Sequence, residues 1–315
     1  MTGTRDFIAA SLFISCLTLS LTSLAQPQDD DNTPDKPAVA LPPDAEHAEA
    51  TIAKSPRHGE WMDIDLPAVD GKPAAHPLHT YVVYPERKDN APVVLVIHEI
   101  FGMTDWVRAV ADQLAAEGFI AVAPDLLSGM APNGGGTEAL GDKATDVIRK
   151  LSPAEAADRL DAALEYALKF PSASGKCACI GFCWGGGTSF MYATHQKKLS
   201  AAAVYYGTPP SKPDGTIDVA AIANINCPVL GLYGGDDSRI TSTVENTKSV
   251  MAAKSKKYIV RIFDGAGHGF LRQSDPVARD GKNHEAAQAA WEETISFFKR
   301  NLEEAPASSE PADEH

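Results

Sequence analysis

Hydrophobic and polar positions divide the middle of the chain into short apolar runs and longer amphipathic stretches. The run Val93-Val94-Leu95-Val96-Ile97 is apolar at every position, which is typical of a parallel strand buried on both faces. The stretch 105–117, which follows it, has the periodicity of an amphipathic helix. Because such runs and stretches alternate, the pattern predicts an α/β fold with a mostly parallel central sheet and helices on both faces.

The predicted elements follow one another without a Pro- or Ser-rich linker. An Asp-Gly pair at 70–71 indicates a hairpin between the first two strands, so the sheet is expected to begin antiparallel. A single domain over 58–302 accounts for the whole alternation. We expect strands at 60–66, 78–84, 93–97, 119–123, 177–181, 201–206, 229–233 and 258–263, and helices at 105–117, 153–170, from 185, 242–253 and 285–302.

The N-terminus has the pattern of an export signal. A basic residue precedes an apolar run over 7–24, which closes with Ser23-Leu24-Ala25, where small residues stand at the positions that a signal peptidase reads. We predict a signal peptide at 1–25 that is cleaved after Ala25, and therefore an exported protein, periplasmic or secreted. Two alternatives are an uncleaved membrane anchor and a lipoprotein signal at Cys16.

Two further segments differ in composition from the predicted domain. Residues 26–57 are rich in Asp, Pro, Ala and Glu and lack sustained periodicity, which is typical of a flexible leader. Residues 303–315 have the same character and are predicted to form a disordered tail.

Composition and charge narrow the class of partner. Hydrophobic residues make up 44% of the chain and charged residues 22%, as in an ordinary globular protein. The formal net charge of −14, without a cluster of Lys and Arg, argues against phosphate backbones and anionic lipid surfaces as partners. We therefore expect a small-molecule partner, no nucleic acid and no stable membrane contact after signal cleavage.

Four cysteines remain after that cleavage: Cys177, Cys179, Cys183 and Cys227. Oxidising compartments favour disulfides, but the first three lie on one predicted strand and at its end, where their side chains cannot easily meet in pairs. Only a Cys177–Cys227 bridge is left open. No neighbouring ligands complete a metal site, so we expect neither a metal nor a cofactor, and we interpret Cys177, Cys179 and Cys227 as small buried residues.

The strongest local motif is Gly181-Phe182-Cys183-Trp184-Gly185, which lies directly between a predicted strand and a predicted helix. It has the pattern of a nucleophile elbow with cysteine in place of serine. Larger residues at the glycine positions would collide with the neighbouring strand and helix. The amino end of the helix favours a thiolate, so we expect Cys183 to be a nucleophile of raised reactivity. The alternative is a glycine-rich turn that holds a buried cysteine.

Two later motifs supply candidate partners for this cysteine. Asp236 and Asp237 follow an apolar strand, and His268 lies in a glycine-rich loop after the last predicted strand. Both positions fall at the edge of the sheet where Cys183 is expected. We choose Asp237 to orient the imidazole, with Asp236 as the near rival. The order nucleophile, acid, histidine is that of the α/β-hydrolases.

These residues predict acyl transfer through a covalent intermediate. His268 would accept the thiol proton, the Cys183 sulfur would attack an acyl carbon, and water would then release the acyl group. The backbone N–H groups of Trp184 and Ile100 are the candidate oxyanion hole. Glu99, at the end of a buried strand, is either solvated at the rim or held close to the thiol, and the rim is the usual place for an isolated glutamate.

Taken together, these motifs resemble the dienelactone hydrolase family. The resemblance rests on His98-Glu99-Ile100-Phe101-Gly102, the cysteine elbow, the Gly-x-x-Asp motif that ends at Asp237 and Gly267-His268-Gly269-Phe270, and it extends from Val93 to the final helix. It implies an α/β-hydrolase fold and a catalytic triad of Cys183, Asp237 and His268. It also implies a catalytic role for Glu99, which would hold the resting thiol and move when substrate arrives.

The resemblance also implies an activity, cofactor-free hydrolysis of small esters or lactones of the carboxymethylenebutenolidase type. Arg272, four residues after the histidine, would correspond to the arginine that binds the substrate carboxylate, with a surface arginine as the alternative. The family's second substrate arginine has no match, and the expected export signal differs from the cytoplasmic members. The alternatives are a thioesterase or other acyl hydrolase, a non-enzymatic binding protein on the same scaffold, and a redox protein that uses Cys177, Cys179 and Cys183.

Overall fold

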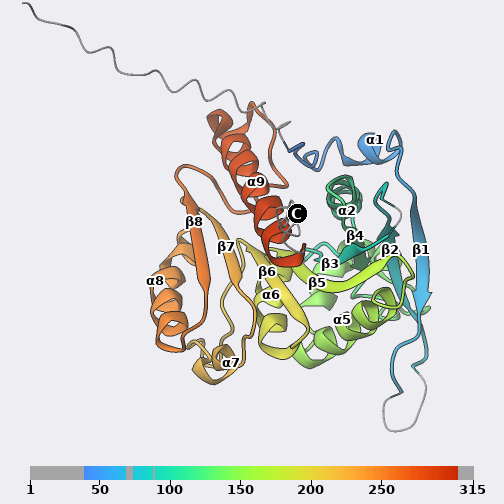
Figure 1. The fold of residues 1–315 in the computed structure, drawn as a ribbon, viewed down its shortest axis with the longest axis horizontal. Coiled ribbons are helices and arrows are strands. Elements are labelled where there is room, and N and C mark those ends of the chain that lie inside the picture. Colours follow the sequence, from blue (N-terminus) through green and yellow to red (C-terminus); the bar gives the residue numbers. More distant parts are fainter. Residues whose placement is uncertain (1–38, 69–73, 88, 304–315) are drawn as a thin grey trace, which may run out of the picture. The chain divides into compact units, whose positions relative to one another are not determined.

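A central sheet organises the computed structural model, which describes residues 39–68, 74–87 and 89–303 (Figure 1). Its strands are β1 (Gly59–Ile64), β2 (Leu78–Val83), β3 (Ala91–Ile97), β4 (Ile120–Pro124), β5 (Ala173–Phe182), β6 (Leu199–Tyr205), β7 (Val229–Gly234) and β8 (Tyr258–Phe263). They lie side by side in the order β1-β2-β4-β3-β5-β6-β7-β8. The β1–β2 and β2–β4 pairs are antiparallel and the other pairs are parallel. The predicted α/β class with a mostly parallel sheet is therefore confirmed.

Helices cover both faces of the sheet. The described helices are α1 (Ala48–Ile52), α2 (Asp105–Ala116), α3 (Thr137–Leu140), α4 (Ala144–Ile148), α5 (Pro153–Ala167), α6 (Trp184–His195), α7 (Val219–Ala223), α8 (Ser238–Ala253) and α9 (Lys282–Leu302), with 3-10 turns at Gly141–Lys143 and Ala278–Gly281. Successive strand residues point to opposite faces. One set packs with α2 and α9, and the other packs with α5 and α6 (Figure 1). This arrangement places the carboxyl ends of β3 and β5 to β8 along one edge.

The folded part begins earlier than the sequence predicts. Residues 39–57 were expected to belong to a flexible leader, but they include α1, and Val39 and Leu41 pack against the core. The indole N–H of Trp106 in α2 donates to the Pro43 carbonyl at 3.1 Å, and the Ala45 N–H donates to the Arg272 carbonyl at 3.0 Å. These contacts move the start of the folded part from residue 58 to residue 39.

Several sequence predictions fall outside the described residues. These are the signal peptide at 1–25, the alternative lipoprotein signal at Cys16, the hairpin turn at 70–71 and nearly all of the tail at 303–315. Within the described ranges, no helix combines the length and the apolar composition that crossing a bilayer requires.

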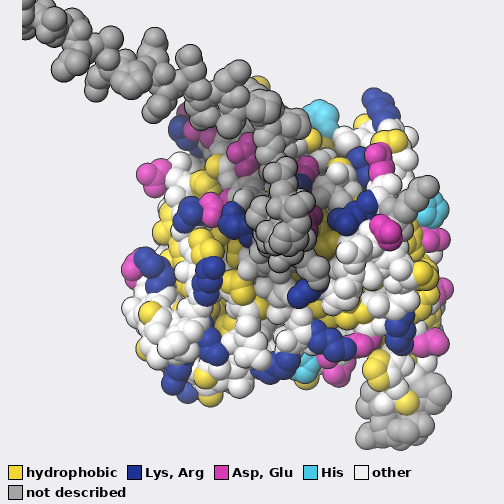
Figure 2. All heavy atoms as spheres, in the orientation of Figure 1, with side chains coloured by type: hydrophobic (Ala, Val, Ile, Leu, Met, Phe, Trp, Pro, Cys, Tyr) yellow, Lys and Arg dark blue, Asp and Glu magenta, His cyan; other side chains and the backbone are white. Residues whose placement is uncertain are grey.

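The surface mixes charges of both signs. On the face drawn in Figure 2, the described Lys and Arg side chains are interspersed with Asp and Glu. A nucleic-acid interface would instead gather basic side chains on one face or along one helix. The described part of this face therefore gives no indication of a nucleic-acid partner.

Candidate active site

Cys183 lies at the sharp turn between β5 and α6, as the elbow motif predicts. Its φ of 55° and ψ of −115° are unusual for a residue with a side chain. A Cβ atom on Gly181 would lie 1.9 Å from the Gly185 carbonyl oxygen, and one on Gly185 would lie 2.3 Å from the His98 carbonyl oxygen. Because those obstacles are backbone atoms, the two glycines are required for β5, β3 and α6 to approach this closely.

The environment of the Cys183 thiol opposes ionisation on balance. Burial raises the thiol pKa, and the nearby Glu99 carboxylate raises it further. Backbone hydrogen bonding from Trp184 and Ile100 and the charge of Arg239 lower it, but less. Burial therefore opposes the thiolate that the helix end favours, and it shifts the pKa toward the neutral thiol in the resting protein. Ile100 and Trp184, whose backbone N–H groups are the candidate oxyanion hole, line the same cavity as Cys183.

His268 is paired with Asp237. The Nδ1 atom of the ring lies 2.5 Å from Oδ2 of Asp237, whose side chain is 7% exposed. Asp237 lies three residues after the end of β7 and directly before α8, while His268 lies in the loop after β8. The neighbouring Asp236 instead binds the Arg279 guanidinium. Of the two adjacent carboxylates, Asp237 is thus the one that can orient the imidazole.

Glu99 is buried and pairs with Arg272. Its side chain is 5% exposed, and its Oε2 atom lies 3.3 Å from Nε of Arg272. Burial raises the pKa of Glu99 to about 7, against the opposing effect of the Arg272 charge. Arg272 also lies over the ring of Phe101, 4.9 Å from its centroid. The solvated rim position is therefore excluded for Glu99, and Arg272 is a cavity residue rather than a surface one.

One cavity of about 620 Å³ brings these groups together. Its lining includes Cys183, His268, Glu99, Arg272, Ile100 and Trp184, which are six of the seven residues chosen from the sequence. Asp237 is the seventh, and it contacts the cavity through His268. Within the described residues, no hydrogen bond joins the Cys183 sulfur to the His268 ring. The volume falls in the range of sites for small molecules.

The cavity also contains residues that the sequence did not single out. Arg149, Arg239, Tyr206 and Thr208 line it. Arg239 stands two residues after Asp237 in the first turn of α8, and Tyr206 follows the end of β6, so their positions at strand ends were a usable signal. Arg149 follows the short helix α4, and only the tertiary fold brings it here. Three arginines give the cavity a preference for anionic ligands.

Tyr206 supports the histidine by packing. Its ring lies edge-on to the His268 ring, with centroids 5.0 Å apart, and its φ is 39°. Among the described residues, its buried hydroxyl has no hydrogen-bond partner. The strained backbone of Tyr206 thus places an uncharged aromatic ring against the imidazole.

The other three cysteines lie away from this cavity and are not oxidised. Cys177, Cys179 and Cys227 are buried free thiols, so the Cys177–Cys227 bridge does not form. Burial raises the pKa of Cys177 to about 11 and of Cys227 to about 12. These thiols are therefore inert in the folded protein.

Comparisons with known proteins give one result. The model of the Dienelactone hydrolase family matches residues 78–302. A Salmonella typhimurium protein named "Putative carboxymethylenebutenolidase" is 31% identical over 228 residues, which are 69% of this chain and 81% of that protein. A protein of the same name from Methylorubrum extorquens is 30% identical over 270 residues, or 84% of this chain and 88% of that one. The crystal structure of a "Putative Dienelactone Hydrolase" from Klebsiella pneumoniae has a TM-score of 0.64 at 25% identity, over 77% of this chain and 99% of that chain.

Proposed function

Because the chain belongs to the dienelactone hydrolase family, we propose that this hydrolase cleaves a small ester or lactone through a covalent acyl-enzyme on Cys183. The observation that carries the proposal is the shared cavity of Cys183, His268 and Glu99, with Asp237 behind the histidine at 2.5 Å. A nucleophile, a base and a group that orients the base are the parts that acyl transfer needs.

The resting state in this proposal is a neutral thiol. Its pKa is raised by burial and by Glu99, while Arg272 holds down the pKa of Glu99. An anionic group on the substrate would compete with Glu99 for Arg272. Without that pairing Glu99 becomes more basic, so it can accept the thiol proton and leave a thiolate beside a neutral carboxyl group. This is how the family role of Glu99 would work with the present contacts.

The acylation step follows from that thiolate. The sulfur attacks the acyl carbon, and the carbonyl oxygen becomes an oxyanion that the N–H groups of Ile100 and Trp184 stabilise. The C–O bond to the leaving alcohol then breaks. The proton that Glu99 took from the thiol passes to His268, and the imidazolium so formed donates it to that oxygen. Asp237 stabilises the imidazolium through Nδ1.

Water completes the cycle. His268 removes a proton from a water molecule, whose oxygen attacks the thioester carbon. The C–S bond breaks, the acid leaves and the thiol regains a proton. The proposed net reaction is hydrolysis of one ester or lactone bond, and no external oxidant or reductant takes part.

The test is a substrate panel with a matched nucleophile-free variant. Activated esters, lactones, thioesters and amides are incubated with wild type and with Cys183→Ala. A compound is scored as a substrate when wild type hydrolyses it and the variant does not. We expect Cys183-dependent turnover of esters or lactones above that of the other classes. Turnover of thioesters alone would replace the proposal with the thioesterase alternative. Binding of these compounds without turnover would favour a binding protein on this scaffold.

We also propose export, on the basis of the pattern at 1–25. Expression of the full chain in a bacterial host with an intact secretion system should yield a periplasmic protein that begins at Gln26. A cell-associated protein whose intact mass retains residues 1–25 would contradict this.

A further inference from the structure

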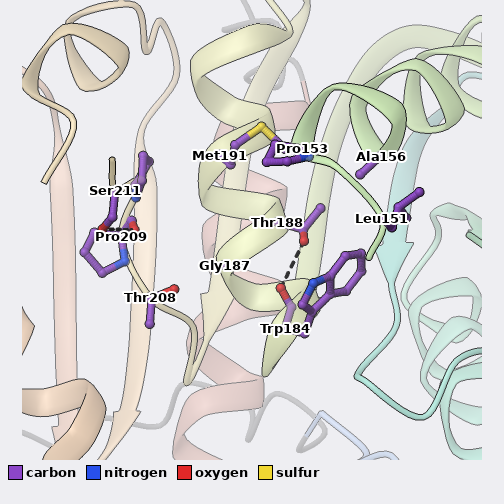
Figure 3. A pocket seen from close by; sticks show the side chains of 11 residues that line it. Leu151, Pro153, Ala156, Trp184, Gly187, Thr188, Met191, Thr208, Pro209 and Ser211 are labelled. Carbon is purple, nitrogen blue, oxygen red and sulfur yellow. Dashed lines mark hydrogen bonds between the residues drawn. The ribbon is translucent and has the colours of Figure 1, made fainter. Parts of the chain in front are cut away.

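A second, smaller pocket of about 270 Å³ adjoins the catalytic cavity (Figure 3). It lies on the outer side of α6, between the start of α5 and the loop of Thr208 to Ser211. Trp184 and Thr208 line both spaces, so they form the boundary between them. Trp184 is the residue directly after the candidate nucleophile, so the boundary between the two spaces includes the chain neighbour of Cys183.

The pocket differs in chemistry from the catalytic cavity. Leu151, Pro153, Met191 and Pro209 supply apolar side chains beside the hydroxyls of three lining residues, and no charged side chain is among the described residues that line it. Its Thr188 hydroxyl donates to the Trp184 carbonyl at 3.0 Å. The pocket can therefore accept hydrocarbon but offers little to a charged group, whose desolvation would go uncompensated.

Of the three hydroxyls that line the pocket, those of Thr188 and Ser211 are engaged within the protein, whereas the Thr208 hydroxyl has no hydrogen-bond partner among the described residues. The Ser211 hydroxyl donates to the Pro209 carbonyl at 3.0 Å (Figure 3). The catalytic cavity, by contrast, is lined by Arg149, Arg239, Arg272 and Glu99. A substrate that spans the two spaces would carry its polar or anionic part in the cavity and its apolar part in the pocket.

The chemistry of the elbow decides which half of the substrate points toward the pocket. In the proposed mechanism, His268 protonates the leaving oxygen, so the alcohol half must lie on the histidine side. His268 lines the catalytic cavity and does not line the pocket. The acyl half is then directed past Trp184, away from the histidine.

We propose that this pocket binds the hydrocarbon chain of the substrate's acyl group, an inference that rests on the proposed ester hydrolysis. A volume of about 270 Å³ suits one substituent better than a whole ligand. Each methylene that moves from water into such a pocket stabilises the transition state by a factor of about four. The enzyme should therefore prefer short to medium acyl chains to acetyl.

The test is a series of p-nitrophenyl esters, which share one leaving group and differ only in acyl length. Wild type should show kcat/KM for the hexanoate on the order of 10²-fold above that for the acetate, because the two differ by four methylenes. Met191→Trp and Ala156→Leu fill the pocket from α6 and α5, and each should lower the hexanoate-to-acetate ratio about tenfold or more. Met191→Ala enlarges the pocket and should move the preferred length toward octanoate.

The ratio is an internal control for folding, because loss of folded protein lowers both rates equally. Ala253→Trp adds the same bulk at the exposed end of α8 and should leave the ratio at its wild-type value. Cys183-dependent hydrolysis with a ratio that neither filling variant changes would overturn the inference and leave the proposed function standing. A change confined to acetate esters of longer alcohols would assign the pocket to the leaving group instead. Absence of any Cys183-dependent ester turnover would be failure of the proposed function itself.

Discussion

Strand β5 carries two cysteines in its interior, and a third lies just beyond its carboxyl end. The two places differ in burial, in backbone conformation and in access to a cavity. Cys177 and Cys179 are fully buried within the strand, and burial raises their pKa values. Cys183 stands one residue past the strand with a positive φ and borders a cavity with charged walls. The same side chain is inert in one place and accessible in the other, so backbone position decides which thiol can react.

The comparison extends to histidines that pair with carboxylates. His268 contacts Asp237 at 2.5 Å inside the cavity, and His195 contacts Asp161 at 2.8 Å on the surface, where α5 and α6 meet. Only the first pair shares a cavity with a candidate nucleophile.

The largest expected effect is the loss of turnover when the pair of His268 and Asp237 is broken. His268→Ala should lower kcat for an activated ester by about 10⁴-fold, because the group that protonates the leaving oxygen and then activates water is lost. His195→Ala is the matched control and should leave kcat within about twofold. Steady-state kinetics on both variants measure this, and comparable losses would show that the pair at the rim has no special role.

The second effect is on the rate of thiol alkylation. In the native protein, iodoacetamide should modify Cys183 on the order of 10³-fold faster than Cys177, Cys179 or Cys227, since the buried thiols react only when the structure opens. Peptide mass spectrometry over a time course gives the four rates. A Cys183 that reacts no faster than its neighbours would argue against the elbow assignment.

The third effect is on stability and concerns the close approach at the elbow. Gly185→Ala should lower the free energy of unfolding by about 3 kcal/mol or more, because its Cβ would lie 2.3 Å from backbone oxygens of β3 and the following loop. Gly187→Ala, in the same helix, places its Cβ 3.1 Å from a Thr208 side-chain oxygen and should change stability by less than about 1 kcal/mol. Urea denaturation compares them, and equal losses would remove the argument from backbone contact.

The fourth effect is the pH dependence of stability that Glu99 creates. Its pKa is raised from 4.5 to about 7 by burial, so the folded state binds more protons than the unfolded state between these values. The stability that protonated Glu99 gives is therefore lost as pH rises through that window. Glu99→Gln should match wild type near about pH 4.5 and be more stable by about 2 kcal/mol near about pH 8.

The control for this fourth effect lies on the surface. Glu245→Gln changes a carboxylate that is 80% exposed and should leave the pH profile unchanged. Unfolding curves at several pH values measure all three proteins. A wild-type advantage over Glu99→Gln that grows with pH would mean that the ionised pair with Arg272 outweighs the burial of Glu99.

Much of the candidate site at the carboxyl edge of the sheet was predictable from the sequence, because short local segments determine it. The glycines around Cys183, the order of the three motifs and the strand-end positions of Asp237 and His268 are properties of short segments. The choice between Asp236 and Asp237 was not, because neighbouring residues in a turn point in different directions and only the fold shows that Asp236 contacts Arg279.

Other features depend on burial, which short patterns do not encode. The raised pKa of the Cys183 thiol comes from desolvation and from Glu99, and both depend on packing between distant segments. Residues 39–57 have the composition of a leader, yet Val39 and Leu41 reach the core. Arg149 enters the cavity from a segment with no motif of its own.

The central claim is that Cys183 forms a covalent bond to the acyl group, and the site of acylation tests it most directly. The protein is mixed with an activated ester, and the reaction is quenched in acid during turnover. The protein is then digested, and the masses of the peptides are measured by mass spectrometry. We expect one added acyl group on the peptide that contains Cys183, and no adduct on that peptide in Cys183→Ala. An acyl group on another residue, with turnover retained by Cys183→Ala, would contradict it.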